Sequence, residues 1–243
     1  MTTSRNRGAS PNDSKEFGEI ALEKLSRAGC DIYYLLNQGY HIKGATEYVG
    51  NHYLLSTRQR MALTRSISSQ SDIISRTSKQ VQGGLEDATV NIDGFNTIIT
   101  LEVALCGSLL LKGLDGAIRD LAGLRGNYRI IDKTELAIDL IGEMLNSQKV
   151  KNAIFYIDEP ISNSGRLREL ILCRLRQYGF DSEVQILHNV DSVLEKLEYV
   201  ITSDAIILDR CISWINLNDM IISEKLDDYR NNKNYVDFGK LIK

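Results

Sequence analysis

Three apolar, strand-like runs of this chain each end on an aspartate: ATVNID at Asp93, NAIFYID at Asp158 and YVITSD at Asp204. Aspartate is a poor strand former and is rarely buried without a partner. Helix-length segments separate the runs, and this alternation predicts a mainly parallel sheet with helices on both faces. The C-terminal ends of parallel strands lie at one edge of a sheet, so we expect these carboxylates to converge. Hard divalent cations prefer such oxygen ligands, which indicates a metal site at this edge.

Composition excludes several classes of protein. The chain has 243 residues, of which 43% are hydrophobic and 25% charged, as in ordinary globular proteins. Its longest apolar stretches, such as LEVALCGSLLL, are far shorter than the roughly 20 residues of a membrane span, and the start lacks an apolar signal segment. The four cysteines are far apart without CxxC spacing, which predicts reduced thiols. We therefore expect a cytoplasmic protein without a membrane partner.

Charge and periodicity divide the chain near residue 82. Residues 1–82 carry 11 basic and 7 acidic residues, whereas the remaining 18 basic and 25 acidic residues give a net charge of −7. Apolar residues at helical spacing predict a small all-α module over residues 1–82, with roughly the first 14 disordered. The Gly83-Gly84 pair marks the boundary to an α/β domain over residues 83–243. In that domain we expect strands at 88–93, 150–158, 183–187 and 200–203, and helices at 97–111, 134–146, 165–178 and 191–199.

The last helix of the N-terminal module is basic. It is opened by Ser56 and presents Arg58, Arg60 and Arg65, of which Arg58 and Arg65 share a face because they are seven residues apart. Arginines on one face are suited to phosphate contacts, so this helix is a candidate nucleic-acid-binding element. The alternative is that the arginines are solvated or paired on the helix surface.

Two strand-end motifs contain additional polar groups. In IDGFN, Gly94 permits a tight turn after the aspartate, and the Asn96 amide is suited to hold a phosphate or to orient the carboxylate. In YIDEPISNSG, the hydroxyls of Ser162 and Ser164 lead into a helix and form a candidate anion site. The alternatives are a helix N-cap for the first aspartate and a serine-capped turn without a ligand.

The third motif, HNVDSVLEKLEYVITSD, joins a helix to a strand end. Asp191 and Glu195 are four residues apart and share a helical face, and Ser203 and Asp204 close the following strand. A helix cap explains Asp191 alone, but it does not explain the polar strand end that follows.

Taken in order, these motifs resemble the PIN-like nuclease superfamily, and most closely its NYN ribonuclease subgroup. That subgroup has a first-strand "DGxN", a middle "FD", a helix opening with "AD…IE" and a final "TSD", and the resemblance covers roughly residues 89–209. It implies a PIN-like fold and a ribonuclease that hydrolyses phosphodiester bonds with Mg²⁺ or Mn²⁺. The implied catalytic metal ligands are Asp93, Asp158, Asp191 and Asp204, with polar support from Asn96 and Ser203. The whole chain is also similar to uncharacterised prokaryotic proteins with a helical N-terminal part.

The chain departs from the subgroup in the segment DGAIRD. Asp115, Arg119 and Asp120 are further candidates for the site, the arginine to hold a phosphate and an aspartate as an extra ligand. The alternative is a capped helix start stabilised by salt bridges.

Two other functions remain open. One is a non-catalytic RNA-binding or adaptor protein on a PIN-like fold, and the other is a phosphatase with Asp93 as nucleophile. Phe95 stands where such phosphatases have a second aspartate, which disfavours the latter. The three histidines lack the spacing of a zinc site, and no glycine-rich phosphate loop is present. Self-association into a homo-oligomer is left open.

Overall fold

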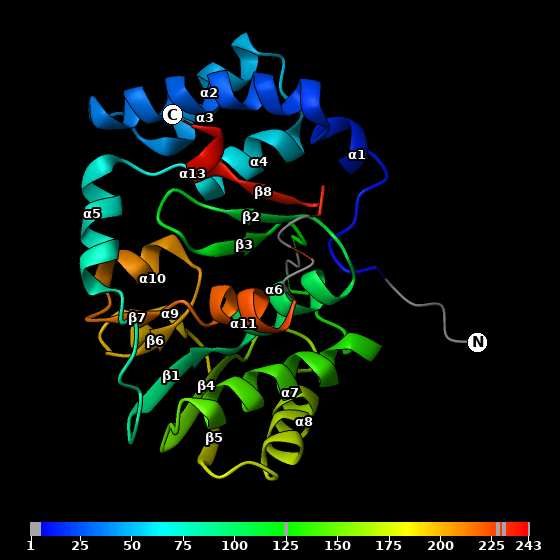
Figure 1. The fold of residues 1–243 in the computed structure, drawn as a ribbon, viewed down its shortest axis with the longest axis vertical. Coiled ribbons are helices and arrows are strands. Elements are labelled where there is room, and N and C mark those ends of the chain that lie inside the picture. The colour runs from blue at the N-terminus through cyan, green and yellow to red at the C-terminus, as the bar shows by residue number, and fades with distance from the viewer. Residues whose placement is uncertain (1–5, 124–125, 227–228, 230–231, 243) are drawn as a thin grey trace.

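The computed structural model describes residues 6–123, 126–226, 229 and 232–242 (Figure 1). In chain order its elements are α1 (Asp13–Glu16), α2 (Glu19–Asn37), α3 (Ile42–His52), α4 (Thr57–Ser66), α5 (Gln70–Lys79), β1 (Thr89–Asp93), α6 (Gly94–Leu105), β2 (Leu110–Lys112), β3 (Ile118–Asp120), α7 (Asp132–Ser147), β4 (Asn152–Asp158), α8 (Ser164–Leu175), β5 (Asp181–Leu187), α9 (Asp191–Leu194), β6 (Val200–Ile201), α10 (Ala205–Arg210), β7 (Trp214–Ile215), α11 (Leu217–Lys225), β8 (Tyr235–Asp237) and α13 (Phe238–Leu241).

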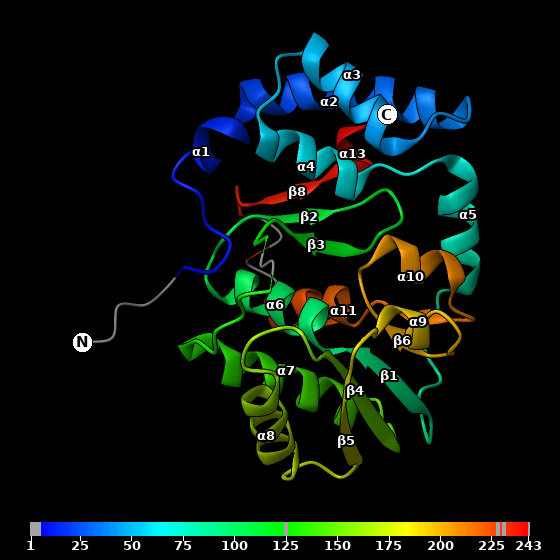
Figure 2. The same ribbon diagram turned by 180° about the vertical axis from the view of Figure 1, so that it is seen from behind.

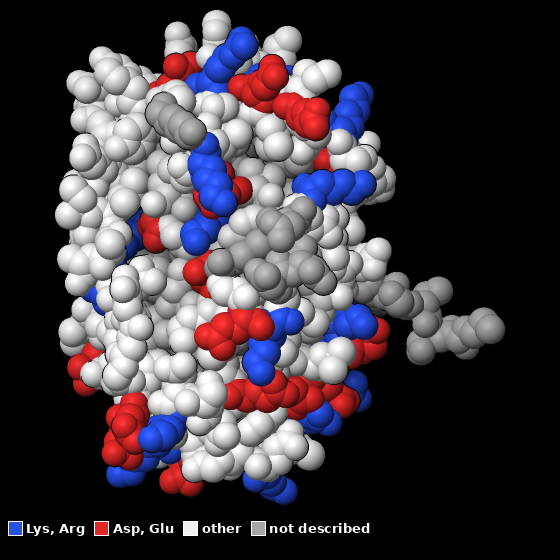
Figure 3. Space-filling model, in the orientation of Figure 1, with Lys and Arg blue, Asp and Glu red and all other residues white. Residues whose placement is uncertain are grey.

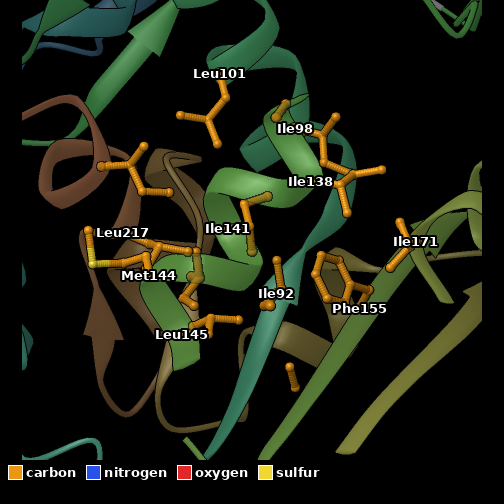
Figure 4. Close-up of a cluster of buried hydrophobic side chains, with 14 of the residues drawn as sticks. Ile92, Ile98, Leu101, Ile138, Ile141, Met144, Leu145, Phe155, Ile171 and Leu217 are labelled. Carbon is orange, nitrogen blue, oxygen red and sulfur yellow. The ribbon is translucent and has the colours of Figure 1, made fainter. Parts of the chain in front are cut away.

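The main sheet has five strands in the order β5-β4-β1-β6-β7, and every pairing is parallel. Successive side chains of a strand point to opposite faces, so the sheet separates two hydrophobic clusters. On one face Ile92 and Phe155 pack with residues of α6, α7, α8 and α11 (Figure 4). On the other face Tyr156 and Trp214 pack with residues of α9 and α10. These observations confirm the predicted α/β class with helices on both faces of a parallel sheet.

A second sheet, in the order β3-β2-β8, lies between the N-terminal helices and the α6/α11 layer (Figures 1 and 2). Leu111 of β2 and Val236 of β8 belong to a hydrophobic cluster with residues of α2, α3 and α4, whereas Leu110 and Ile118 belong to the cluster of the main sheet. The helical N-terminal region therefore shares its core with strands that lie beyond residue 82. The division at residue 82 stays a prediction.

The second sheet was not expected from the sequence. The predicted helix over 97–111 is instead α6, which ends at Leu105 before a left-handed Gly107, followed by strand β2. The segment proposed as a helix start around Asp115 is the turn of the β2–β3 hairpin. Hairpin pairing outweighs the helical spacing of these residues, because the alternation of β2 places Leu110 in the cluster of the main sheet and Leu111 in the cluster of the N-terminal helices.

The N-terminal end is more ordered than the sequence suggests. Within the stretch predicted to be disordered, residues 1–5 lie outside the described residues, but Arg7 is buried against Glu102 of α6, at 2.6 Å from Nε to Oε2. The expected Ser56 cap of α4 is present as a capping box with Gln59. Among the described helices, none is long and apolar enough to cross a membrane.

Candidate carboxylate site

Strand pleating places Asp93 and Asp158 on the same face of the main sheet. Asp93 is the last residue of β1 and pairs in register with Tyr156, and Asp158 lies two residues further along β4. Residues two apart in a strand share a face, so both aspartates point to the side that Tyr156 shares with α9 and α10. The sheet thus directs two strand-end carboxylates toward the helices that follow β5 and β6.

Those two helices begin with the other two aspartates. Asp191 is the first residue of α9, and Asp204 is the N-cap of α10, where its Oδ1 accepts hydrogen bonds from the main-chain N–H groups of Ile206 (2.8 Å) and Ile207 (3.4 Å). The helix starts follow directly from the C-terminal ends of parallel strands, which is where α/β folds place their ligand sites. We define Asp93, Asp158, Asp191 and Asp204 as the carboxylate cluster.

The four carboxylates are close enough to repel one another. Burial raises the pKa of Asp93 to about 7; hydrogen bonds from Asn96 and Thr202 counteract this shift, and the charge of Asp204 adds to it. Burial also raises the pKa of Asp191, with further contributions from Asp204 and Asp158. Since acids within a few ångströms destabilise each other's ionised form, the shifts link all four residues into one group.

The pKa of Asp158 is likewise raised by burial, against a hydrogen bond from the main chain of Val190. Among the described residues, no Lys or Arg forms a salt bridge with any member of the carboxylate cluster. Most other buried acids of the chain are paired with arginine, as Asp115 and Glu102 are. The cluster therefore concentrates negative charge that the protein itself leaves uncompensated.

Asp93 is the most rigidly held member. It is 3% exposed, and its Oδ2 accepts hydrogen bonds from Asn96 Nδ2 (2.6 Å) and Thr202 Oγ1 (2.7 Å). Asn96 thus orients the carboxylate, one of the two roles considered for it. Gly94 permits this geometry, because a Cβ there would lie 3.0 Å from the carbonyl oxygen of Tyr156.

Thr202 was missed in the sequence analysis, which selected Ser203 from the same TSD motif. In the β1–β6 pairing Ile92 lies opposite Ile201, so one further step along both strands brings Thr202 beside Asp93. Its hydroxyl also accepts a hydrogen bond from the N–H of Asp204 at 3.1 Å. Strand register is the signal that would have identified it, and register is not visible before the strand order is known.

The donor set of the carboxylate cluster suits Mg²⁺ or Mn²⁺, which both bind carboxylate oxygens. The side chains do not form a ready-made cage: within the described part of the chain, no group of three or more His, Cys, Asp or Glu residues is arranged to hold a metal ion. Residues that fit by chemistry are therefore present, and their side chains would have to move closer together around a cation.

Arg119, Asp115 and Asp120 have other partners. The Arg119 guanidinium is buried and donates to both oxygens of Asp115 (2.8 and 2.6 Å) and, through Nε, to the main-chain carbonyl of Ser203 (2.8 Å). Burial would raise the pKa of Asp115, but Arg119 and Arg76 outweigh this and hold it at about 2. Asp120 accepts from Thr100 Oγ1 at 3.0 Å and from a main-chain N–H. The arginine therefore binds the loop beside the site, and its donors are not available to a phosphate.

The remaining supporting candidates are also engaged within the protein. The hydroxyl of Ser162 donates to the Tyr128 carbonyl (2.9 Å), and that of Ser164 to the Asp158 carbonyl (2.8 Å). Glu195 pairs with Arg210 at 2.7 Å. The serine hydroxyls thus fix the loop between β4 and α8 by donating to main-chain carbonyls, whereas neither hydroxyl caps α8.

The arginines of α4 have partners within the protein. Arg58 pairs with Asp13 at 2.5 Å and donates to the carbonyls of Leu121 (3.0 Å) and Gly8 (2.6 Å). Arg65 donates to the carbonyl of Asp120, and Arg60 donates to carbonyls of α3 and to that of Leu55. Arg58 is largely enclosed, whereas the side chain of Arg65 stays 39% exposed. Nucleic-acid binding by these residues stays a prediction.

The described surface in Figure 3 shows Lys and Arg interspersed with Asp and Glu rather than one continuous basic face. A pocket lined by Ile20, Leu54 and polar residues such as Lys15 lies on the N-terminal helices. No member of the carboxylate cluster lines this pocket.

Comparisons with known proteins place the chain among families without an assigned activity. The model described as "Protein of unknown function (DUF434)" matches residues 24–79, and the model described as "Domain of unknown function (DUF5616)" matches residues 82–220. Uncharacterized protein MJ0935 of Methanocaldococcus jannaschii is 33% identical over 187 residues, which cover 76% of this chain and 88% of that protein. No solved structure matches the chain. The second of these models spans more than half of the chain, so the chain belongs to the family described as "Domain of unknown function (DUF5616)".

Proposed function

We propose that the protein is a metal-dependent nuclease, most specifically a ribonuclease that hydrolyses RNA phosphodiester bonds at the carboxylate cluster. The observation that carries this proposal is the juxtaposition of Asp93, Asp158, Asp191 and Asp204 with no basic partner among the described residues. Bringing four carboxylates together without a positive charge is unfavourable for folding, and a bound cation would offset this repulsion. The order of the motifs, which resembles that of NYN ribonucleases, supports RNA as the substrate.

Each residue of the site has a role in this proposal. Asp93, held by Asn96 and Thr202, and Asp204, held at the start of α10, supply fixed oxygen ligands. Asp158 is half-buried and Asp191 is exposed, and neither carboxylate caps a helix, so they supply ligands that adjust to the cation. A Mg²⁺ or Mn²⁺ ion bound there would activate water and stabilise the charge on the attacked phosphate.

Two further observations bear on the alternatives. Phe95, at the position of the second aspartate of a phosphatase, is buried and packs edge-on against Tyr128, with ring centroids 5.1 Å apart. This disfavours the phosphatase. The structure describes no disulfide among the cysteines, which supports a reducing compartment such as the cytoplasm.

The test is incubation of the purified protein with labelled single-stranded RNA in Mn²⁺ or Mg²⁺, beside EDTA. We expect cleavage that EDTA and Asp204→Asn abolish. Asp181→Asn is the matched control, because it removes the same charge from an exposed residue at the opposite end of the sheet. Binding that persists in EDTA without any cleavage would instead identify an RNA-binding adaptor, and equal cleavage by both variants would refute the site.

A further inference from the structure

An ion network, buried except for its outer member Asp209, connects the N-terminal helices to the carboxylate cluster. Its members are Arg76 of α5, Asp115 and Arg119 of the β2–β3 hairpin, and Asp209 of α10. Arg76 donates to Asp115 Oδ2 and to Asp209 Oδ1, each at 2.6 Å. Asp115 in turn holds Arg119, so one carboxylate joins two arginines from distant segments.

The network ends on the loop that carries two groups of the site. Arg119 Nε donates to the carbonyl of Ser203, which stands between Thr202, the partner of Asp93, and Asp204. Asp209 lies on α10, the helix that Asp204 caps. The same network therefore holds both the loop before α10 and the helix itself.

Two other contacts fix the N-terminal end of the network. The carbonyl of Arg76 accepts a hydrogen bond from Trp214 Nε1 at 2.7 Å, and Val81 donates to the carbonyl of Trp214 at 2.8 Å. Gly113 is required on the hairpin side, because a Cβ there would collide with the Arg119 guanidinium and Asp115. Neither arginine has room to reach a ligand outside the protein.

We propose that Arg119 is a positioning residue of the carboxylate cluster and that Arg76 makes the N-terminal helix α5 a required part of the site without touching its ligands. That this loop carries ligands of a cation rests on the proposed function. That Arg119 fixes the loop rests only on the hydrogen bond to Ser203. The network also joins the segments matched by the two family models, because Arg76 lies in the first and Asp115 in the second.

The decisive variant is Arg119→Lys. Lysine keeps a charge beside Asp115, but a single ammonium cannot replace the planar fork that reaches both Asp115 and Ser203. The matched control is Arg7→Lys, because Arg7 is also a buried arginine that binds a carboxylate, Glu102, and a main-chain carbonyl, that of Arg129. Arg7 contacts neither the cluster nor its loop.

The first measurement is hydrogen exchange of peptides covering residues 200–208 in metal-free buffer. We expect exchange there to be about fivefold faster in Arg119→Lys than in the wild type, and unchanged in Arg7→Lys. Arg76→Lys should accelerate the same peptides, and it serves as the test if Arg119→Lys does not fold. Unchanged exchange in both network variants, or an equal change in Arg7→Lys, overturns the proposal.

The second measurement is Mn²⁺ affinity by calorimetry, where loss of a positioning contact should weaken binding about tenfold in Arg119→Lys but not in Arg7→Lys. A wild-type protein that binds no Mn²⁺ would refute the proposed function, while the exchange experiment still decides the role of the network. Equal Mn²⁺ affinity in wild type and Arg119→Lys would show that the network does not position the ligands.

Discussion

Replacing Asp93 by asparagine should stabilise the protein at alkaline pH and destabilise it at acidic pH. The folded-state pKa of Asp93 is raised from 3.8 to about 7, chiefly by burial. The folded protein therefore binds a proton more tightly than the unfolded chain, and wild-type stability falls as the pH rises from about 4 to about 7. A difference of about 3 pKa units corresponds to a loss of roughly 4 kcal/mol by pH 8.

Asp93→Asn removes this titration and keeps the shape of the side chain. The asparagine amide has one acceptor oxygen where the carboxylate has two, so some of the donors of Asn96 and Thr202 that bind Asp93 lose their acceptor, which costs about 1 kcal/mol at all pH values. We therefore expect the variant to be less stable than wild type by about 1 kcal/mol at pH 3 and more stable by about 2–3 kcal/mol at pH 8. Near the unfolding midpoint of a chain of this size, the alkaline gain corresponds to a rise in Tm of roughly 4–12 °C.

The assay is urea denaturation from pH 3 to 8.5 in EDTA, with Asp181→Asn as control for the change in net charge. The stability curves of wild type and Asp93→Asn should cross, whereas those of wild type and Asp181→Asn should stay parallel. Added Mn²⁺ should stabilise the wild type at pH 8 more than the variant, because the cation compensates the negative charge of the Asp93 carboxylate. A variant that is less stable than wild type by the same amount at every pH would refute the argument that burial raises the pKa of Asp93.

Two other substitutions test the packing around the site and the role of α4. Gly94→Ala should destabilise the protein by about 1–3 kcal/mol in thermal unfolding, because the new Cβ would press on the backbone of β4. Gly44→Ala, at an open position of α3, is the control and should stabilise the protein by about 0.5–1 kcal/mol. Equal effects of the two substitutions would contradict the close contact at Gly94. Arg58→Ala should lower the free energy of unfolding by about 1–3 kcal/mol, because Asp13 and two main-chain carbonyls lose their donor. An unchanged Tm together with weaker RNA binding would instead indicate that Arg58 binds phosphate.

The local pattern of the sequence was sufficient to predict four of the five strands of the main sheet, but it missed the short strand β7. Strands ending at Asp93 and Asp158 follow from apolar runs that stop at a polar residue, and the parallel direction of the strands follows from the intervening helices. The sequence also placed Asp191 at a helix start, whereas it placed Asp204 at a strand end and gave no sign of the helix that Asp204 caps. These features depend on residues that are neighbours in the chain, which is the information a sequence displays directly.

The tertiary structure alone decided which polar groups serve each carboxylate. Thr202 reaches Asp93 through strand register, and Arg119 reaches the Ser203 carbonyl across 84 positions of sequence. The second sheet joins β8, near the end of the chain, to β2, so its pairing could not be inferred from local propensity. Hydrogen bonds and burial of charge depend on which segments meet in space, and the buried arginines looked like surface charge in the sequence because charge by itself does not reveal its partner.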